Sequence, residues 1–239
     1  MESFVLTENN IMHEDNHIIV VVKPQNVPSQ EDSTGDKDML SAVKEYLKTK
    51  YEKPGNAFCG LVHRLDRPTG GVMVFAKTSK AAARLADSIK SDEFDKTYLA
   101  VTEGVPKEKT GRLIHYLMKN EEKNTVYTVP QSTVGAKYAE LTYKLRFTNE
   151  KHALLEVKLA TGRSHQIRVQ LASIGIPICG DYRYGRVAKA SELALWAAEL
   201  KFPHPVTDKT MVFRAYPPDI GPWNEFDINQ IMNIARITP

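Results

Sequence analysis

The sequence has little cysteine, no long apolar run and almost no excess of charge. Its two cysteines, Cys59 and Cys179, lack the spacing of metal ligands, so we expect buried thiols and neither a disulfide framework nor a metal site. No apolar stretch approaches the roughly 18–20 residues that cross a membrane. The net charge of +3, from 32 basic and 29 acidic residues, is too small to indicate nucleic-acid binding by itself.

The opening residues MESFVLTENN also lack the basic region and apolar run of a signal peptide, so we expect a cytoplasmic protein. The chain has 239 residues, 42% hydrophobic and 26% charged. This is the composition of an ordinary globular protein, and the length suffices for one large domain or two small ones. Nothing in the sequence reports on assembly, so a monomer is the default expectation.

Apolar periodicity predicts a mixed order of strands and helices. Continuous apolar runs or alternation predict strands at residues 18–22, 72–76, 98–101, 138–147, 153–159 and 211–215. Residues 193–202 alternate imperfectly and fit a strand or a helix, of which we favour the strand. Helices are predicted from residue 39, from a cap at Ser79, from Ser164 and over residues 224–235. Residues 1–16 are mostly polar and predict a loosely attached lead-in. Because regular β-α-β alternation is absent, we expect an α+β fold around a largely antiparallel sheet.

The first chemical motif, HRLDRPTGG from His63 to Gly71, places Asp66 between Arg64 and Arg67 directly before a buried strand. The proline and the two glycines of this segment favour a tight turn, so we expect the loop to hold one carboxylate at a rigid tip. The flanking arginines favour the ionised carboxylate, which can act as a nucleophile or base at a sugar carbon. From spacing alone, a surface ion pair is the more common meaning of an aspartate beside arginine.

A second motif, TGRSHQIR, spans residues 161–168. Gly162 permits a sharp turn, and a helix that starts at Ser164 would direct its first amide groups and Arg163 to one point. These groups could bind a phosphate or a carboxylate. The alternative is an ordinary capped helix with surface arginines and no ligand. In the following turn, residues 180–185, tyrosines alternate with an arginine. The turn could stack on bases, or it could be an ordinary turn without a ligand.

Together these motifs resemble those of the RluA family of RNA pseudouridine synthases. Residues 63–69 with the following strand are similar to the family's catalytic motif, residues 96–100 (KTYLA) to its tyrosine motif, and residues 161–168 to its third motif. Residues 11–28 resemble the family's opening strand, and the likeness extends to about residue 217. Gly70 and Gln170 depart from the pattern, because a serine and a histidine are common at these positions.

The resemblance implies the pseudouridine synthase fold, which is α+β with a largely antiparallel mixed sheet, flanking helices and loops, and an active-site cleft across the sheet. It implies a lead-in at residues 1–10 and a catalytic domain over residues 11–239. Many relatives carry an S4-type RNA-binding domain before the catalytic domain. This sequence resembles the form without it, so we expect the catalytic domain itself to recognise RNA.

The same resemblance implies an isomerase that converts selected uridines of rRNA or tRNA to pseudouridine, with RNA as its partner and without cofactor, metal or membrane. It implies that Asp66 is the catalytic carboxylate, that Arg163 pairs with it, and that Tyr98 packs against the uracil. Arg64 is implied to fill the space that the extruded base leaves. The other implied substrate contacts are His63, Thr69, Ile167 and Arg168.

Two other classes of protein remain as alternatives. One is a catalytically inactive RNA-binding domain of the same fold, although the presence of Asp66, Tyr98 and Arg163 argues against it. The other is a carboxylate glycosidase or nucleosidase, which normally needs two carboxylates flanking the bond. The motif around Asp66 contains no second acidic residue, so we favour the synthase.

Overall fold

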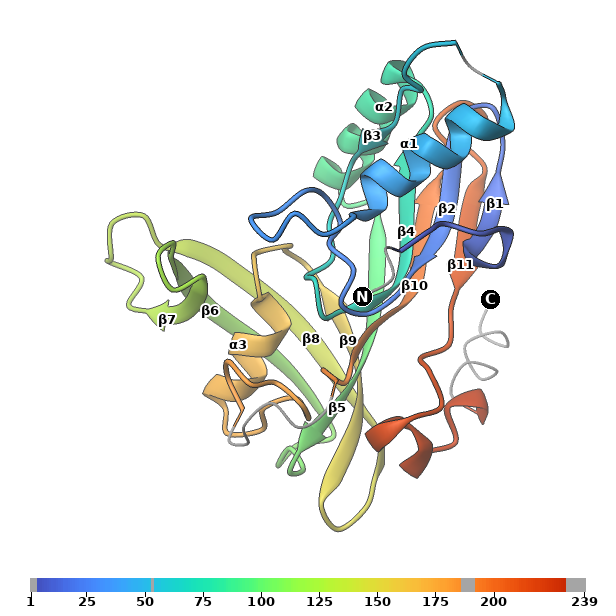
Figure 1. The fold of residues 1–239 in the computed structure, drawn as a ribbon. Coiled ribbons are helices and arrows are strands. Elements are labelled where there is room, and N and C mark those ends of the chain that lie inside the picture. Colours follow the sequence, from blue (N-terminus) through green and yellow to red (C-terminus); the bar gives the residue numbers. More distant parts are fainter. Residues whose placement is uncertain (1–3, 53, 186–191, 231–239) are drawn as a thin grey trace. The chain divides into compact units, whose positions relative to one another are not determined.

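The structure is a computed structural model that describes residues 4–52, 54–185 and 192–230. Its elements are labelled in Figure 1 and fall into two compact units. Unit 1 takes in the described residues of Met1–Asp95 and Ala197–Ala215, and unit 2 those of Lys96–Trp196 and Tyr216–Pro239. None of the helices in the described part of the chain is long and apolar enough to cross a membrane.

The sheet of unit 1 is built on two hydrophobic strands. β2 (Ile18–Lys23) and β4 (Gly70–Ala76) run antiparallel, with Ile18 opposite Ala76 and Lys23 opposite Gly71. β1 (Ile11–Glu14) pairs with β2, and β3 (Gly60–Leu61) pairs with β4. β10 (Leu195–Pro203) neighbours β4 and pairs with β11 (Thr210–Arg214). The chain that leads into β4 therefore enters the middle of this sheet.

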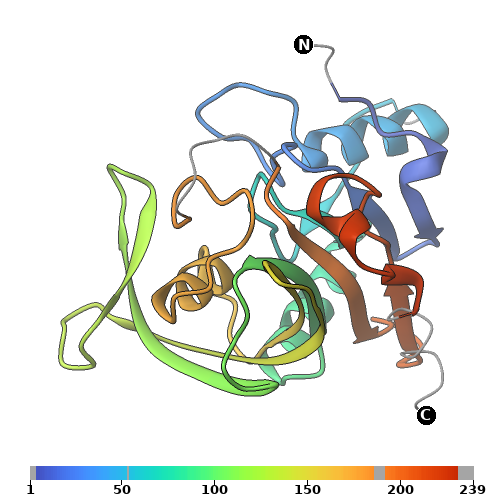
Figure 2. The same cartoon turned by 90° about the horizontal axis from the view of Figure 1, so that it is seen from below.

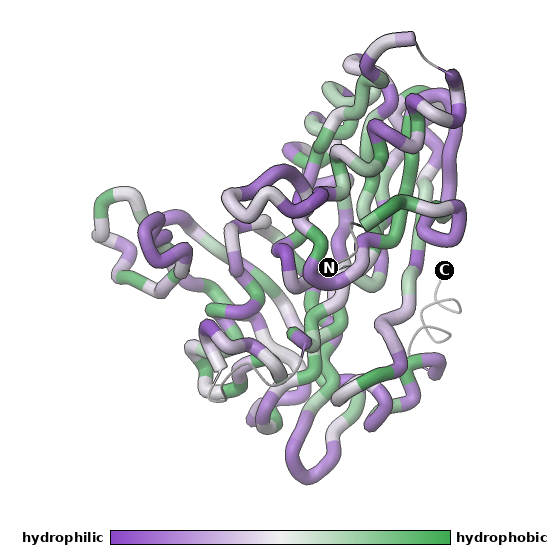
Figure 3. The backbone as a smooth tube through the Cα atoms, viewed as in Figure 1, coloured by the Kyte–Doolittle hydropathy of each residue, from purple (hydrophilic) through white to green (hydrophobic). Residues whose placement is uncertain are grey.

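The core of unit 1 lies on both faces of its sheet. Every residue from Ile18 to Val21 and from Val72 to Ala76 is at most 1% exposed, whereas a sheet with one wet face would alternate. Hydrophobic residues follow these strands in Figure 3, and polar residues gather in the loops. Burial on both faces stabilises β2 and β4, and it gives the loop before β4 a rigid base.

Two capped helices cover this core. α1 (Met39–Lys50) follows Asp38, whose side chain accepts a hydrogen bond from the amide of Ser41 at 3.0 Å. α2 (Ser79–Lys90) follows Thr78, which caps the amide of Ala81 at 3.1 Å. A cap of this kind contributes about 1 kcal/mol. The apolar positions of both helices recur every three or four residues, so each buries one stripe and leaves its polar face in water.

Gly71 allows β4 to approach β10 closely. Its φ of +121° lies in a region that side chains rarely adopt, and a Cβ at this position would meet the carbonyl oxygen of Ala197 at 2.2 Å. Any other residue would push the two strands apart. Because Gly71 comes directly after the loop that carries Asp66, the requirement for glycine fixes one end of that loop.

Among its described residues, unit 2 has a sheet of five antiparallel strands. Their order is β5 (Asp95–Glu103), β9 (His152–Leu159), β8 (Lys137–Thr148), β6 (Thr110–Asn120) and β7 (Thr125–Val129). α3 (Gln166–Ser173) lies within the curve of β6 and β8 in Figure 2. It packs there on a buried cluster of Leu117, Val126, Ala139 and Val169.

The strands of unit 2 have one buried and one exposed face. On β8, Ala139, Leu141 and Tyr143 are buried on the side of α3, which we call the α3 face. The alternate residues Thr142 and Lys144 are exposed on the opposite side, which we call the outer face. This alternation is the pattern of an antiparallel sheet with one solvated face.

The α+β class and all the predicted strands are confirmed. The prediction that residues 1–16 are only loosely attached is wrong, because Ile11–Glu14 forms β1 and Leu6 is buried. α2 is capped by Thr78, one residue before the predicted Ser79. The closing helix is present in part, as a 3-10 turn (η2, Gly221–Glu225) and helical residues 228–230. Residues 231–235 of that prediction lie outside the described residues.

Candidate active site

Asp66 lies in a tight turn that leads into β4. The amide of Thr69 donates a hydrogen bond to the carbonyl oxygen of Asp66 at 2.9 Å, which closes the turn. Leu65 and Thr69 are only 6% and 2% exposed, whereas Asp66 between them is partly exposed. The buried neighbours fix the backbone, so the carboxylate of Asp66 stands on a rigid support.

Three side chains of residues 23–29 hold the backbone of this loop. They donate hydrogen bonds to its carbonyl oxygens, in the pairs Lys23–Arg67 (2.9 Å), Gln25–Pro68 (3.0 Å) and Ser29–Leu65 (2.7 Å). Ser29 also accepts a hydrogen bond from the amide of Leu65 at 3.1 Å. We call this set of contacts the backbone clamp. It fixes the main chain on both sides of Asp66 without using the side chains of the loop.

Lys23 is the buried member of the clamp, with no exposed surface. Its ammonium also donates to the carbonyl oxygens of Pro24 at 3.0 Å and Val27 at 2.5 Å. Burial lowers the pKa of Lys23 from 10.5 to about 7, and the Asp66 carboxylate acts in the opposite direction. Because a neutral amine has only two N–H groups, only the protonated form donates to all three acceptors.

Lys23→Met is expected to destabilise the protein and to change the pH dependence of its stability. The variant leaves three part-buried carbonyl groups without their donor, and each of them that water does not reach costs about 1–3 kcal/mol. Because the pKa of Lys23 is lower in the folded chain, the unfolded chain binds more protons between about pH 7 and 10.5. Wild-type stability therefore gains with rising pH in that window through Lys23, and the variant lacks this gain.

Urea denaturation at about pH 7 and about pH 10 measures both effects of Lys23→Met. The difference in unfolding free energy between wild type and variant should widen towards the higher pH. A difference that is constant with pH contradicts the role given to Lys23. Lys48→Met is the matched control, since Lys48 is exposed in the last turn of α1.

Arg67 has a role other than the one expected from the sequence. Its guanidinium binds the loop of residues 32–36, where it donates to Thr34 at 2.8 Å and pairs with Asp32 and Asp36. These two carboxylates raise the pKa of Arg67. Arg67 therefore ties two loops together. Its expected effect on the ionisation of Asp66 stays a prediction.

His63 and Arg64 precede Asp66 and differ in exposure. The Nε2 of His63 accepts a hydrogen bond from the amide of Val74 at 3.1 Å, and its ring packs edge-on against Phe94 with centroids 5.4 Å apart. An acceptor Nε2 requires the proton on Nδ1. His63 thus supports the loop from β4. Arg64 is exposed, which is the condition for a contact with RNA.

Tyr98 lies on β5 and is 7% exposed. It pairs with Val157, which pairs in turn with Tyr143, so Tyr98 belongs to the α3 face. Lys96 shares this face, and its Nζ comes within 3.8 Å of the place that a Cβ on Gly162 would occupy. Burial lowers the pKa of Lys96. The tyrosine motif and the third motif therefore meet within unit 2.

Arg163 is an exposed residue on an anchored loop between β9 and α3. Its amide donates to the side chain of Gln166 at 3.0 Å, and that buried side chain donates to the carbonyl oxygen of Glu140 at 2.9 Å. The Nε of Arg163 donates to the carbonyl oxygen of Tyr138 at 3.0 Å. These contacts tie the loop to β8, and no contact within the described residues engages the two Nη groups of Arg163.

The third motif differs from its prediction at the start of the helix. α3 begins at Gln166, two residues after the predicted Ser164, because His165 takes a left-handed conformation with φ of 50°. The side chain of Gln166 takes up the amide of Arg163. The predicted start of the helix at Ser164 is therefore wrong, and the amide of Arg163 is bound within the loop. The anion site itself stays a prediction.

Arg168 is a buried arginine in α3, 2% exposed. Its Nε and Nη2 donate to the two carboxylate oxygens of Asp181, both at 2.7 Å. Asp181 also accepts from the amide groups of Arg183 and Tyr184 at 3.1 and 3.2 Å. The pair thus fixes the turn of residues 181–184 on α3. Ile167, 4% exposed, is part of the core of unit 2.

In that turn, Tyr184 has a structural role. Its hydroxyl accepts a hydrogen bond from the amide of Val126 at 2.7 Å, and its ring stacks with the guanidinium of Arg168 at 5.2 Å. The neighbouring Tyr182, which is 48% exposed, stacks with Arg183 at 5.2 Å. Of the two tyrosines, only Tyr182 has the exposure that a stacking contact with a base requires.

The predicted site residues fall into two groups. His63, Arg64, Asp66 and Thr69 share the loop before β4 in unit 1, and Tyr98, Arg163, Ile167 and Arg168 belong to unit 2. The sequence reasoning missed the backbone clamp and Asp181. The only local signal was the Lys23-Pro24 turn at the end of a buried strand. The described residues contain no group of three or more His, Cys, Asp and Glu side chains placed to hold a metal ion.

The geometry has counterparts among known proteins. Residues 17–173 match the family described as RNA pseudouridylate synthase. The chain is 34% identical over 219 residues to the "Uncharacterized RNA pseudouridine synthase YhcT" of Bacillus subtilis, covering 89% of this chain and 70% of that protein. It is 35% identical over 226 residues to "Ribosomal large subunit pseudouridine synthase D" of Vibrio cholerae, covering 88% of this chain and 68% of that protein.

Solved structures share the fold. "Human RNA Pseudouridylate Synthase Domain Containing 4" superposes with a TM-score of 0.75 at 22% identity, covering 88% of this chain and 89% of that one. "Human RNA Pseudouridylate Synthase Domain Containing 1" gives 0.71 at 21% identity, with coverages of 96% and 95%. With the family match over residues 17–173 and relatives above 30% identity, the chain belongs to the RluA family of RNA pseudouridine synthases.

Proposed function

We propose that this protein isomerises selected uridines of RNA to pseudouridine, and that Asp66 is the carboxylate that starts the reaction. The observation that carries the assignment of Asp66 is the backbone clamp, which holds a partly exposed carboxylate between two buried residues. Ribosomal RNA is the substrate class to test first, because a relative at 35% identity is named for the large ribosomal subunit. Transfer RNA is the second.

In the proposed reaction, the C1′–N1 bond of a uridine breaks, the uracil turns, and C5 bonds to C1′. The hydrogen on C5 leaves as a proton and N1 gains a proton, so product and substrate have the same composition. The Asp66 carboxylate acts either as a nucleophile at the ribose or as a base that removes a ribose proton. Both routes require an ionised carboxylate at the sugar of an extruded nucleotide.

Arg163 and Tyr98 are proposed as the partners of this carboxylate and of the base. The anchored loop and the two Nη groups of Arg163 support a bidentate contact with Asp66, which would orient the carboxylate better than lysine could. Tyr98 is proposed to pack against the uracil and to take part in removing the C5 proton. Its place on a strand beside the third motif supports a fixed ring position.

The remaining residues are proposed to bind the substrate or to support the site. The exposure of Arg64 supports its insertion where the base leaves the stack. The buried hydroxyl of Thr69 has no hydrogen-bond partner among the described residues, which supports a polar contact made with substrate. Ile167 is proposed as an apolar wall. His63 and Arg168 are proposed to position the two motifs, since each is bound to neighbouring structure.

Tritium release tests the proposed function directly. RNA transcribed with uridine labelled at C5 loses tritium to water when C5 bonds to the sugar, so release from a ribosomal RNA transcript is the expected result. No release from ribosomal or transfer RNA would refute the proposal. RNA binding without release would favour the inactive RNA-binding alternative, and free uracil among the products would favour a nucleosidase.

Arg163→Lys is expected to lose most of the activity, by roughly 10²-fold, because lysine keeps the charge but not the two-pronged contact. Unfolding free energy should change little, since Arg163 is exposed. The measurement is tritium release at saturating RNA. Both Arg163→Lys and Arg168→Lys are assayed at a temperature at which they remain folded. If Arg163→Lys has wild-type turnover and Arg168→Lys is inactive, Arg168 and not Arg163 is the residue that pairs with Asp66.

A further inference from the structure

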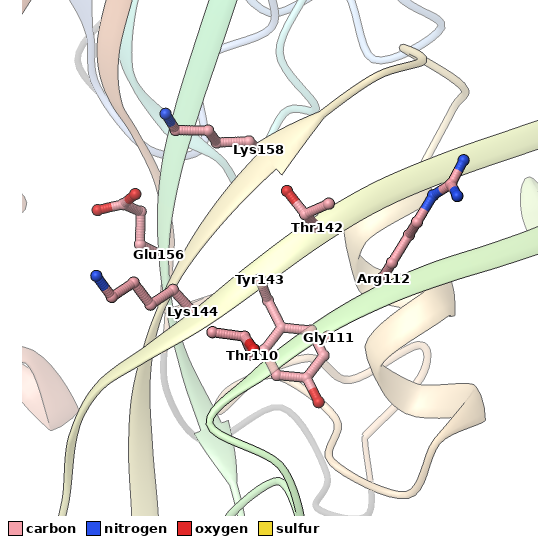
Figure 4. A pocket seen from close by; sticks show the side chains of 8 residues that line it. All are labelled: Thr110, Gly111, Arg112, Thr142, Tyr143, Lys144, Glu156 and Lys158. Atoms are coloured by element: carbon pink, nitrogen blue, oxygen red, sulfur yellow. The ribbon is translucent and has the colours of Figure 1, made fainter.

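The outer face of the unit 2 sheet is hollowed between β6, β8 and β9. The hollow has a volume of about 510 Å³ and is lined chiefly by charged and hydroxyl side chains, namely Thr110, Arg112, Thr142, Lys144, Glu156 and Lys158. Gly111 and Tyr143 also line it. Figure 4 shows Thr142, Lys144 and Lys158 projecting from one side of the strands. None of the motifs singled out in the sequence lies here.

Strand register brings the basic residues of this hollow together. Arg112 is opposite Thr142, and Thr142 is opposite Lys158, so these three side chains form one row across the strands. In the next row, Lys144 lies between Thr110 and Glu156. Neighbouring strands are about 4.8 Å apart, so the three basic side chains start within roughly 10 Å of one another.

This surface is separate from the proposed catalytic residue of unit 2. Tyr98, Val157 and Tyr143 follow one another in register on the α3 face. Residues adjacent to them in each strand point to the opposite side. Tyr143 is directed away from Lys144 and Lys158 in Figure 4. A ligand in the hollow would therefore lie behind the sheet that carries Tyr98.

The charges of the outer face leave a positive excess. Two carboxylates are already paired, Glu140 with Arg112 at 2.7 and 3.0 Å, and Glu156 with Arg146. Lys144 and Lys158 are exposed and form no ion pair with any described residue. The face therefore presents two uncompensated ammonium groups beside the hydroxyls of Thr110 and Thr142, which together suit phosphate oxygens.

An aromatic pair continues the same face beyond the basic rows. Tyr116 is opposite Tyr138, with ring centroids 5.8 Å apart, and Ile114 beside them is 44% exposed. Tyr138 is 37% exposed. From Tyr138 to Lys144 the strand advances six residues at about 3.3 Å each, roughly 20 Å. Tyr116 is partly exposed. Accessible aromatic rings followed by cations are the combination that binds single-stranded nucleic acid through stacking and phosphate contacts.

We propose that this outer face binds a single-stranded segment of RNA, with the phosphates at Lys144 and Lys158 and the bases against Tyr116 and Tyr138. The inference rests on the proposed function, because the segment bound to the outer face is taken to belong to the substrate RNA and to flank the modified uridine. The face adds affinity and takes no part in the chemistry. It gives the catalytic domain an RNA contact outside the motifs of the family.

The double variant Lys144→Ala/Lys158→Ala tests the phosphate contacts. The probe is a fluorescein-labelled single-stranded oligouridine, and the readout is its dissociation constant by fluorescence anisotropy over a series of salt concentrations. The constant should rise about tenfold at low salt, and the slope of log affinity against log salt should fall by about 1.4, or about 0.7 for each lost phosphate contact. Equal affinity and equal slope would overturn the proposal.

Lys44→Ala/Lys48→Ala is the matched control, because it removes the same charge from exposed positions of α1. An equal loss of affinity in this control would reduce the effect to net charge and also overturn the proposal. On labelled ribosomal RNA, the Lys144→Ala/Lys158→Ala variant should raise the KM for tritium release and leave kcat unchanged. If neither the wild type nor the variants release tritium, the proposed function fails. The oligouridine affinities of wild type and variants still test whether the outer face binds RNA.

A pair of tyrosine variants tests the stacking contact. Tyr138→Leu keeps an apolar side chain and removes the ring, so its dissociation constant for the oligouridine should rise by roughly fivefold or more. Tyr138→Phe keeps the ring and should bind like wild type, although it loses the hydroxyl that donates to Glu140. Equal affinity of the two variants would overturn the aromatic part of the proposal.

Discussion

Asp66→Ala is expected to abolish pseudouridine formation, with a loss of roughly 10³-fold or more, as when other enzymes lose a reacting side chain. The substitution removes the carboxylate and leaves the backbone clamp intact, because the clamp binds carbonyl oxygens of neighbouring residues. RNA affinity and unfolding free energy should therefore stay near those of wild type. Tritium release, anisotropy and urea denaturation measure the three quantities.

The control for this prediction is a second aspartate in unit 1. Asp92→Asn removes one exposed carboxylate and keeps a left-handed backbone, φ 58°, that asparagine tolerates. It should leave turnover unchanged. Asp66→Asn, which preserves the size of the side chain, should be as inactive as Asp66→Ala. Turnover retained in both Asp66 variants would refute the assignment of the catalytic carboxylate.

Asp181→Asn is expected to have the largest effect on stability. Asp181 and Arg168 are buried and joined by two hydrogen bonds of 2.7 Å. Asparagine removes the negative charge that faces the guanidinium of Arg168, and removing one charge of a buried ion pair costs about 3–5 kcal/mol. The turn of residues 181–184 also loses part of its support, since Asp181 accepts from two of its amide groups. Urea denaturation followed by circular dichroism measures the loss.

An exposed ion pair provides the comparison. Asp87 and Lys90 are 3.2 Å apart, with side chains 73% and 77% exposed. Exposed pairs of this kind contribute little, so Asp87→Asn should leave the unfolding free energy nearly unchanged. If Asp181→Asn were as mild as Asp87→Asn, the buried pair would not be what holds α3 and the turn of residues 181–184 together.

The two central strands of unit 1 were predictable because strands buried on both faces are continuous apolar runs in the sequence. Residues 18–22 and 72–76 are continuous apolar runs, and both are buried on two faces. β1 has no such run, since Ile11–Glu14 alternates poorly and becomes a strand only through its pairing with β2. The start of α3 was misplaced because His165 adopts a left-handed conformation, which neighbouring sequence does not dictate.

The site could be predicted only where its residues form short motifs. Asp66, Tyr98 and Arg163 stand in three such segments and were all named from the sequence. Lys23 and Asp181 were missed because lysine and aspartate are ordinarily exposed, and their burial depends on partners 44 and 13 residues away. No local pattern encodes such partners, so these contacts become visible only in the folded chain.

The backbone clamp has a consequence for mutational tolerance. Its hydrogen bonds involve main-chain atoms of the loop, the carbonyl oxygens of residues 65, 67 and 68 and the amide of residue 65, so most replacements at these positions leave the contacts available. The donor positions tolerate fewer replacements, because each hydrogen bond depends on the length and donor group of the side chain of Lys23, Gln25 or Ser29. A saturation scan should therefore find its strictest positions on the supporting segment, some forty residues upstream of the chemistry.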